Sequence, residues 1–440
     1  MKRPSILLLG FLALSACAVQ KPHGKNRLIV KEIKNSTVFS KAFTGFTLLD
    51  PKTGKTLVDH LGDHYFTPAS NTKILTLAAC LEVLGDSVPG MQLIQTDTKL
   101  LFRGTGDPTF LHPDFKHWQS CFGTLANPRY DSLIRCYYPR SFDAPRFGAG
   151  WAWDDYTEDY QAERSEMPIY GNLIQINSNG VGNTQITPDF FQKNWQLRSG
   201  GNQPGVVRIE YENYWTLEPR KKVDQVSVPM FHPPVDKLIA DTIHRDIEDL
   251  RYSEHPYQNL YPTRTLYSAP IDTVLRRMMW QSDNFIAEQM LLVCAGVKYD
   301  FLQQDTVIKW MLDSVLTNLP QRPRWVDGSG LSRYNMNSPQ SIAQVLLHLW
   351  KTQPGERLFD LFPKGGVNGT LESWYAGKNG KPYVFAKTGG LRGVACLSGY
   401  IKCNSGNVLI FSFMNNNFAE SSRPWKAEMQ RILELIRDRY

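Results

Sequence analysis

The stretch TPASNTKILTLAAC, residues 67–80, starts with small and polar residues and continues as an apolar run with helical spacing. The run stops at Gly85, so the pattern predicts a helix over residues 72–85. Ser70 opens this helix, and Lys73 follows one turn later on the same face, within reach of the serine hydroxyl. Serine is also a common helix cap, and about one or two S-x-x-K matches are expected by chance in a chain of this length. The stretch is a candidate catalytic pair that needs support from elsewhere in the chain.

Two other short motifs give that support. Ser282-Asp283-Asn284 stands just before a predicted helix, and Lys387-Thr388-Gly389 ends a predicted strand. S-x-x-K, S-D-N and K-T-G occur together in β-lactamases and penicillin-binding proteins. A second K-T-G, residues 52–54, follows a proline in a turn-like stretch, and we expect it to be structural.

The residue types suit nucleophilic catalysis. The first turn of a helix has unpaired backbone N–H groups that favour developing negative charge. An amine that is desolvated and close to other cations loses basicity. A neutral Lys73 is then able to accept the proton of Ser70, which activates the hydroxyl.

With these motifs, the chain resembles the class C low-molecular-mass penicillin-binding proteins, the D-alanyl-D-alanine carboxypeptidase/endopeptidase family. The separation of 212 positions from Ser70 to Ser282 also fits that family, since compact β-lactamases have no domain inserted there. The resemblance covers most of the chain and extends to further segments: GTGDPTF (104–110), GWAWDD (150–155), SDNFIAE (282–288), VDGSGLSRYN (326–335), GVNGTL (366–371) and KTGGLRGVACLSGY (387–400).

The resemblance implies a role for each motif residue. Ser70 attacks the peptide carbonyl between two D-alanines and forms an acyl-enzyme, with Lys73 as the general base. Ser282 relays a proton to the leaving amine, and Asn284 holds the substrate backbone. Lys387 supplies positive charge to the cleft.

Four further positions follow from the same resemblance. Thr388 and Gly389 shape the strand that pairs with the substrate, and the backbone N–H groups of Ser70 and Gly390 form the oxyanion hole. Asp155 resembles a family aspartate that faces the cleft and receives an amino group of the stem peptide. The alternative for Asp155 is a solvated loop carboxylate.

One position departs from the family. Thr or Ser usually follows K-T-G, but this chain has Gly390. The backbone N–H remains, whereas the hydroxyl that helps bind a terminal carboxylate is absent, which puts carboxypeptidase efficiency in doubt. Arg392 is a candidate substitute, although a surface arginine is the commoner case.

Composition along the chain predicts an inserted domain. Strand and helix patterns at both ends suggest one shared serine DD-peptidase domain, residues 28–89 and 263–440, while residues 90–262 are loop-rich and largely β. The expected fold class is α/β: a penicillin-binding/β-lactamase-like transpeptidase domain with an antiparallel sheet, flanking helices and a helical subdomain. The β-rich insertion lies between S-x-x-K and S-D-N.

The first residues have the form of an export signal. Two cations precede about ten apolar residues, and LSAC at residues 14–17 resembles the lipobox of bacterial lipoproteins. We expect lipid on Cys17, a tether over residues 18–27 and a lipid-anchored location in the bacterial cell envelope, in the periplasm. The alternative is a simple cleavable signal.

The six remaining cysteines raise the question of disulfides, because export permits them. Cys121 and Cys136 are close in sequence and are the best candidate pair. Cys396 and Cys403 lie on opposite faces of one predicted strand and cannot bridge each other. The other two, Cys80 and Cys294, are expected in helix cores. No spacing resembles a zinc site, so no metal or other cofactor is expected.

These observations favour an exported, penicillin-sensitive serine DD-peptidase that acts on peptidoglycan stem peptides as carboxypeptidase, endopeptidase or both. β-Lactam antibiotics are the expected covalent inhibitors. The formal net charge of +7 is mild and scattered, so nucleic acid is not an expected partner. The alternatives are a β-lactamase and a non-catalytic peptidoglycan-binding module on the same fold.

Overall fold

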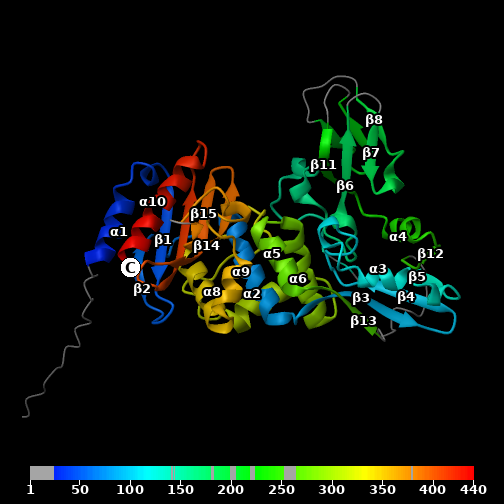
Figure 1. Ribbon diagram of the computed structural model, residues 1–440, viewed down its shortest axis with the longest axis horizontal. Helices are drawn as coiled ribbons and strands as arrows, with labels where there is room; N and C mark the ends of the chain where they lie inside the picture. Colours follow the sequence, from blue (N-terminus) through cyan, green and yellow to red (C-terminus); the bar gives the residue numbers. More distant parts are fainter. Residues whose placement is uncertain are drawn as a thin grey trace, which may run out of the picture.

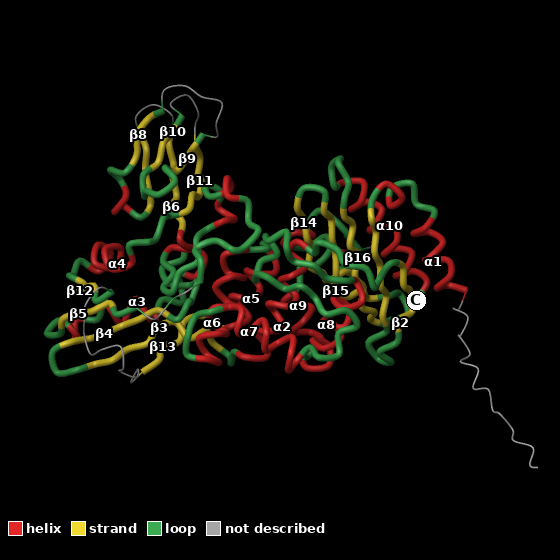
Figure 2. The backbone as a smooth tube through the Cα atoms, turned by 180° about the vertical axis from the view of Figure 1, so that it is seen from behind, coloured by secondary structure: helices red, strands yellow, loops and turns green. Residues whose placement is uncertain are grey.

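The computed structural model describes residues 24–139, 142, 144–179, 183–198, 205–218, 223–251, 264–377 and 380–440. The leader, Cys17 and residues 18–23 of the expected tether lie outside these ranges. Figure 1 shows an elongated molecule with strands at both ends and a block of helices between them. The view from behind in Figure 2 shows the same three-part arrangement.

One end of the molecule is a five-stranded antiparallel sheet built from both ends of the chain. Strand β1, near the N-terminus, lies between β2 and the C-terminal strand β16, so the sheet needs both chain ends. Nearly every residue of β15 is buried, because helices cover both faces of the sheet. The strands, in spatial order, are β14 (Val384–Leu391), β15 (Val394–Lys402), β16 (Val408–Asn416), β1 (Phe43–Leu49) and β2 (Thr56–His60).

The outer face of this sheet is covered by the first and last helices. Helix α10 (Arg423–Arg439) presents Trp425, Met429, Ile432, Leu433 and Ile436 to the sheet, and their helical spacing makes them one apolar face. Helix α1 spans Gly24–Lys34, so it begins inside the tether that the sequence predicted over residues 18–27. Residues 24–27 are therefore helical, and the helix ends before Ser36, whose hydroxyl accepts from the N–H of Phe39.

The inner face of the sheet packs on a helical layer. Two helices at its centre are buried on nearly all sides: every residue of α2 from Lys73 to Cys80, and of α6 from Phe285 to Ala295. A helix that is apolar all round belongs in a core, so these two helices form rigid supports. The layer comprises α2 (Lys73–Val83), α5 (Ile271–Trp280), α6 (Asn284–Tyr299), α7 (Gln304–Trp310), which continues as a π-helical turn (Met311–Val315), α8 (Pro339–Thr352) and α9 (Gly355–Leu361).

The other end of the molecule is the β-rich insertion. Its first and last strands, β3 (Ser87–Gln95) and β13 (Arg264–Pro270), pair with each other, so the chain enters and leaves side by side. The predicted boundary at residue 90 falls inside β3, and residue 262 lies outside the described ranges. The other elements are β4 (Lys99–Gly104), α3 (Ser120–Leu125), β5 (Ile134–Tyr137), β6 (Leu173–Ser178), β7 (Thr184–Thr187), β8 (Trp195–Leu197), β9 (Val206–Arg208), β10 (Trp215–Leu217), β11 (Val223–Pro229), α4 (Val235–Ile243) and β12 (Ile247–Asp249).

The expected Cys121–Cys136 disulfide is wrong, since both thiols are free and buried. Tyr137 faces the core that contains Cys121 of α3, while Cys136 faces a separate small core with Leu101. Adjacent residues of a strand point to opposite faces, so β5 turns Cys136 away from α3. Cys396 and Cys403 lie in different cores, as expected.

Cys80 and Cys294 lie in the core between α2 and α6, with their sulfur atoms 3.9 Å apart. This agrees with their expected place in helix cores. None of the described helices has both the length and the apolar character needed to cross a bilayer.

Candidate active site

The serine of S-x-x-K lies in a short 3-10 helix, Ala69–Thr72, that leads directly into α2. The predicted α-helix therefore begins at Lys73 rather than at residue 72. Lys73 Nζ donates a hydrogen bond to Ser70 Oγ over 3.0 Å, so the two side chains meet as the spacing indicated. Gly330 packs so closely under this turn that a Cβ there would lie 1.9 Å from the carbonyl oxygen of Ala69.

Lys73 is completely buried and has three hydrogen-bond acceptors. Besides Ser70, its Nζ donates to Asn284 Oδ1 and to the Ser329 carbonyl, each at 2.7 Å. These acceptors match the three N–H bonds of an ammonium group. Burial lowers the pKa of Lys73 to about 8, against the opposing effect of the nearby carboxylates of Asp283, Asp327 and Glu288. With this pKa, about a tenth of the lysine is neutral at pH 7, and that fraction can act as a proton acceptor.

The S-D-N motif forms the corner before α6. Asp283 caps the helix by accepting a hydrogen bond from the N–H of Ile286 over 2.9 Å. Ser282, just before it, has a φ of 59°, a strained conformation for a residue with a side chain. The corner brings both motif side chains to the two buried lysines: Ser282 accepts from Lys387, and Asn284 accepts from Lys73.

The second lysine comes from the exposed edge of the sheet. Lys387 on β14 is completely buried, and its Nζ donates to Ser282 Oγ (2.8 Å) and to the Thr388 carbonyl (2.9 Å). Burial, and then the charge of Lys73, hold the pKa of Lys387 well below its usual value. The K-T-G lysine therefore contacts the S-D-N serine directly.

The free edge of β14 is oriented for pairing. The N–H of Ala386 and the carbonyl of Val384 bond outward, to Pro363 and Gly365, whereas Tyr383 bonds to Lys402 of β15. Bonding direction alternates along an antiparallel strand, so the backbone groups of residues 388 and 390 also face outward. The N–H of Gly390 is thereby directed outward from the free edge of β14.

The two glycines at the end of K-T-G differ in their surroundings. A Cβ on Gly389 would lie 2.4 Å from the Pro68 carbonyl oxygen and 2.6 Å from Asn71 Nδ2, so β14 packs tightly on the serine turn. A Cβ on Gly390 would have nothing within 4 Å. The position at which the family usually has a Thr or Ser side chain is therefore open space in this protein. The neighbouring Thr388 donates a hydrogen bond from Oγ1 to Thr370 Oγ1 over 2.9 Å.

Two other sequence candidates lie away from these contacts. The upstream K-T-G forms a surface turn in which Lys52 Nζ donates to Asn407 Oδ1 over 3.0 Å, in agreement with a structural role. Arg392 is exposed in the turn between β14 and β15.

Asp155 lies on the insertion side of the site, in a 3-10 helix over Trp153–Asp155. It hydrogen-bonds the hydroxyl of Tyr160 and, after burial, is the main cause of the raised pKa of that phenol. The carbonyl of Tyr160 accepts from Asn284 Nδ2 over 3.1 Å. Asp155 is thus two contacts away from the S-D-N asparagine.

Sequence reasoning missed two buried carboxylates. Asp327 accepts hydrogen bonds from the N–H groups of Gly330 (2.8 Å) and Ser332 (2.6 Å), and from two side chains, Trp151 (2.9 Å) and Asn335 (2.7 Å). These bonds fix the loop that presents the Ser329 carbonyl to Lys73.

The other missed carboxylate, Glu288, accepts from the N–H of Ser329 over 2.7 Å. Burial raises its pKa to about 7, with Arg164 Nη1 3.5 Å away. For Glu288, the available sequence signal was a charged residue within the apolar run of α6. For Asp327, it was the segment VDGSGLSRYN, residues 326–335. Within the described ranges, no group of three or more His, Cys, Asp or Glu side chains is arranged to hold a metal ion.

Comparisons with known proteins match these features over most of the chain. The sequence model of the D-Ala-D-Ala carboxypeptidase 3 (S13) family matches residues 29–190 and 249–436. D-alanyl-D-alanine carboxypeptidase DacB of Haemophilus influenzae is 24% identical over 90% of each chain.

Solved structures agree with the fold. The crystal structure of penicillin binding protein 4 (dacB) from Haemophilus influenzae superimposes with a TM-score of 0.73 at 21% identity, covering 93% of this chain and 99% of that one. A complex of that protein with a novel β-lactam has a TM-score of 0.68 at 19% identity and the same coverage. The predicted fold class and family resemblance are confirmed, and the chain belongs to the D-Ala-D-Ala carboxypeptidase 3 (S13) family.

Proposed function

We propose that the protein is an exported, penicillin-sensitive serine DD-peptidase that hydrolyses the D-Ala-D-Ala end of peptidoglycan stem peptides, D-alanyl cross-links between them, or both. The observation that carries the proposal is the contact of Lys73 Nζ with Ser70 Oγ inside a buried network that also holds Asn284. Family membership and the carboxypeptidase relative support the same chemistry.

Acylation is the first half of the proposed reaction. Ser70 Oγ attacks the carbonyl carbon of the scissile peptide and passes its proton to neutral Lys73. The N–H groups of Ser70 and Gly390 stabilise the oxyanion. When the C–N bond breaks, the leaving amine takes a proton from Ser282, and Ser282 takes one from Lys387 through their hydrogen bond. Lys387 recovers its proton from neighbouring Lys73, which had received it from Ser70, so Lys73 is neutral again.

Hydrolysis of the acyl-enzyme is the second half. Water attacks the ester carbonyl, the bond to Ser70 Oγ breaks, and the serine recovers its proton as the carboxylic acid product leaves. Lys73 is the base for this step also, because it keeps its contact with the serine oxygen.

The proposed substrate lies along β14 as an added strand, using backbone bonds to the outward groups of residues 388 and 390. Thr388 and Gly389 shape this edge, and Asn284 holds the backbone of the acyl half. Asp155, beside Tyr160, receives an amino group of the stem peptide. β-Lactams acylate the same serine in this proposal, which the β-lactam complex of the Haemophilus protein supports.

Location and domain division are parts of the same proposal. The leader ending in LSAC supports periplasmic delivery and a lipid anchor on Cys17. The peptidase domain comprises residues 28–89 and 263–440, with residues 90–262 inserted, and the pairing of β3 with β13 supports a narrow junction between them.

The test is covalent labelling by a fluorescent penicillin. The wild type should be labelled and Ser70→Ala should not, because the variant lacks the hydroxyl that is acylated in the proposed reaction. Two lysines in K-T-G motifs make a matched pair: Lys387→Ala should impair labelling severely, and Lys52→Ala should leave it intact. Equal labelling of Ser70→Ala would refute the nucleophile, and an unlabelled wild type would favour the non-catalytic module.

A β-lactamase would behave differently in the same assay. It would release the label within seconds and turn over a chromogenic cephalosporin many times, whereas a DD-peptidase should keep the acyl group and release D-alanine from a D-Ala-D-Ala pentapeptide.

A further inference from the structure

A cavity of about 570 Å³ lies at the end of the K-T-G motif, between β14 and the start of α10. Thr388 and Gly390 both line it, because residues two apart in a strand share a face. Thr370, from the 3-10 turn over Gly369–Leu371, lines it as well. The cavity therefore adjoins the glycine whose N–H is proposed to hold the oxyanion.

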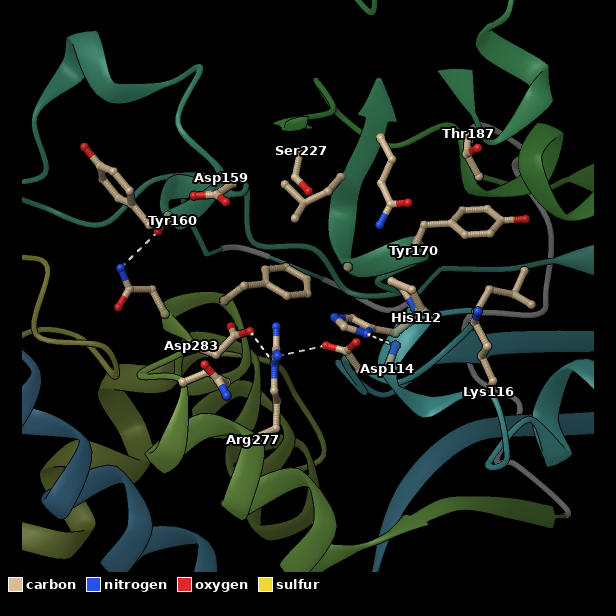
Figure 3. Close-up of a pocket in the computed structure, with 18 of the residues that line it drawn as sticks. His112, Asp114, Lys116, Asp159, Tyr160, Tyr170, Thr187, Ser227, Arg277 and Asp283 are labelled. Carbon is tan, nitrogen blue, oxygen red and sulfur yellow. Dashed lines mark hydrogen bonds and ion pairs between the residues drawn. The ribbon is translucent and has the colours of Figure 1, made fainter. Parts of the chain in front are cut away.

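The charges of this cavity differ from those of a larger one, of about 900 Å³, behind the S-D-N corner. The larger cavity is lined by two cations and three carboxylates, and Figure 3 shows the carboxylates of Asp114, Asp159 and Asp283 around it. Among its described lining residues, the smaller cavity has one cation, Lys426 of α10, and no acidic residue. The smaller cavity is therefore the better place for a negatively charged group.

The segment that carries Thr370 is fixed against the edge of β14. Backbone hydrogen bonds tie residues 363 and 365 to residues 386 and 384 of the strand, over 3.0 and 2.9 Å. This pairing ends before residues 388 and 390, at which the substrate is proposed to pair. The chain then turns at Gly369, where φ is 58° and a Cβ would lie 2.6 Å from the Trp280 carbonyl oxygen. Thr370 is thus held beside the substrate position.

Thr370 also has a hydroxyl hydrogen to donate. Thr388 Oγ1 donates to Thr370 Oγ1 over 2.9 Å, so this contact uses the hydrogen of Thr388 and leaves that of Thr370. Within the described part of the chain, Thr370 donates to no acceptor. A hydroxyl that accepts one hydrogen bond becomes a stronger donor for the next. The wall of the cavity therefore presents a polarised donor.

The proposed reaction brings a carboxylate to this place. The oxyanion is held at the N–H of Gly390, and the leaving amine is attached to the same carbonyl carbon. The α-carboxylate of the leaving amino acid is two bonds beyond that amine, within about one residue length, 3.3 Å, of the scissile bond. A Cβ on Gly390 would have nothing within 4 Å, so the space beside this glycine is open to the carboxylate.

Resting on the function proposed above, we propose that Thr370 is a specificity-determining residue whose hydroxyl binds the α-carboxylate of the leaving amino acid. It supplies, from the neighbouring segment, a hydroxyl that β14 lacks at Gly390. Lys426 adds positive charge to the same cavity. A carboxylate accepts about four hydrogen bonds, so the contact with Thr370 is compatible with a further one from position 390.

Two activated substrates that differ only in this carboxylate test the assignment. One is N-acetyl-D-alanyl thioglycolate, whose leaving group carries the carboxylate, and the other is the matching neutral thioglycolamide. Thr370→Val keeps the branched shape without the hydroxyl. It should lower kcat/KM for the thioglycolate about tenfold or more, because a hydrogen bond to a charged group is lost, and leave kcat/KM for the thioglycolamide unchanged. Thr370→Ser keeps the hydroxyl and should match the wild type on both substrates.

Thr352→Val, at an exposed position at the end of α8, is the matched control and should change neither rate. If Thr370→Val slows both substrates equally, the hydroxyl acts only by supporting β14. If it slows neither, or if Thr370→Ser loses as much as Thr370→Val, the hydroxyl does not bind the carboxylate; each of these results overturns the inference. Failure of the proposed function is separate, since the wild type would then hydrolyse neither thioester and would not be labelled by penicillin.

Discussion

Lys73 has an acceptor for each of its N–H bonds, and in the proposed reaction only its neutral form accepts the proton of Ser70. Its pKa of about 8 lies below the usual value of 10.5, so the neutral base predominates only above pH 8. Below that pH, the rate of penicillin acylation should fall about tenfold per pH unit and should level off above it. Stopped-flow acylation between pH 5.5 and 9.5 measures this.

Lys73→Met nearly preserves side-chain volume and serves as the control. Its rate of penicillin acylation should be about 10²–10⁴ times lower than that of the wild type, and the pH dependence caused by Lys73 should disappear. A flat wild-type profile would mean that another group accepts the proton.

Gly390 leaves open space where the family usually has a hydroxyl. Gly390→Thr should fit without a clash on the strand edge, where a β-branched residue is favoured. A hydrogen bond to a charged group contributes about 1.5–3 kcal/mol, so D-alanine release from a pentapeptide should become about tenfold faster or more. Gly390→Val has the same shape without the hydroxyl and should give no gain; an equal gain from both variants would exclude the hydroxyl as the cause.

At the residue scale, the sequence identified the side chains that now meet around Ser70, because three short motifs keep their order and spacing. Their contacts agree with that prediction, while their roles stay proposals until tested. Asp327 and Glu288 were missed because their partners come from distant segments, and nothing in a local pattern shows which backbone N–H groups a carboxylate will meet. The predicted disulfide between Cys121 and Cys136 was wrong, because closeness in sequence does not show which face of a strand a cysteine side chain occupies.

Among the elements, the loop over residues 327–335 is organised by one carboxylate. Asp327→Asn keeps the shape but replaces one oxygen by an NH₂ group, which cannot accept from Trp151 and Ser332. Each lost bond in a buried site costs about 1–3 kcal/mol, so the melting temperature should fall by several degrees.

The same variant should also change the pH profile. The charge of Asp327 raises the pKa of Lys73, so its removal should shift the midpoint of the acylation profile to lower pH. Asp305→Asn, at an exposed position, is the control and should change neither the melting temperature nor the midpoint. An unchanged midpoint together with a lower melting temperature would show that the loop is structural only.

Most strands and helices of the peptidase part follow their periodic patterns, so their existence could be predicted. The short turn before α2 could not, because a 3-10 and an α-helical start share the same spacing of Ser70 and Lys73. Helix α9 and most of the short strands of the insertion could not be predicted either, because segments of three to seven residues are too short to show a clear hydrophobic period.

At the scale of the whole molecule, the position of the enzyme depends on the proposed anchor. The tether expected over residues 18–27 has ten residues, and six of them, 18–23, precede helix α1. Six extended residues reach about 20 Å, so the folded part should stay close to the membrane surface. Cys17→Ser should remove incorporation of labelled fatty acid and leave the protein unanchored, with unchanged activity on soluble muropeptides. A wild type that takes up no fatty acid would refute the anchor.

Because the sheet is built from both ends of the chain, the active site can form only late in synthesis. Ser70 emerges early in synthesis, but β1 completes its pairing only with β16, which ends at Asn416, 346 residues later. At about 5–20 residues per second, roughly 20–70 s separate the nucleophile from the strands that hold Lys387 against it. If Ser70 is the nucleophile, we therefore expect penicillin not to acylate a growing polypeptide. We expect the same of a chain that ends before β16.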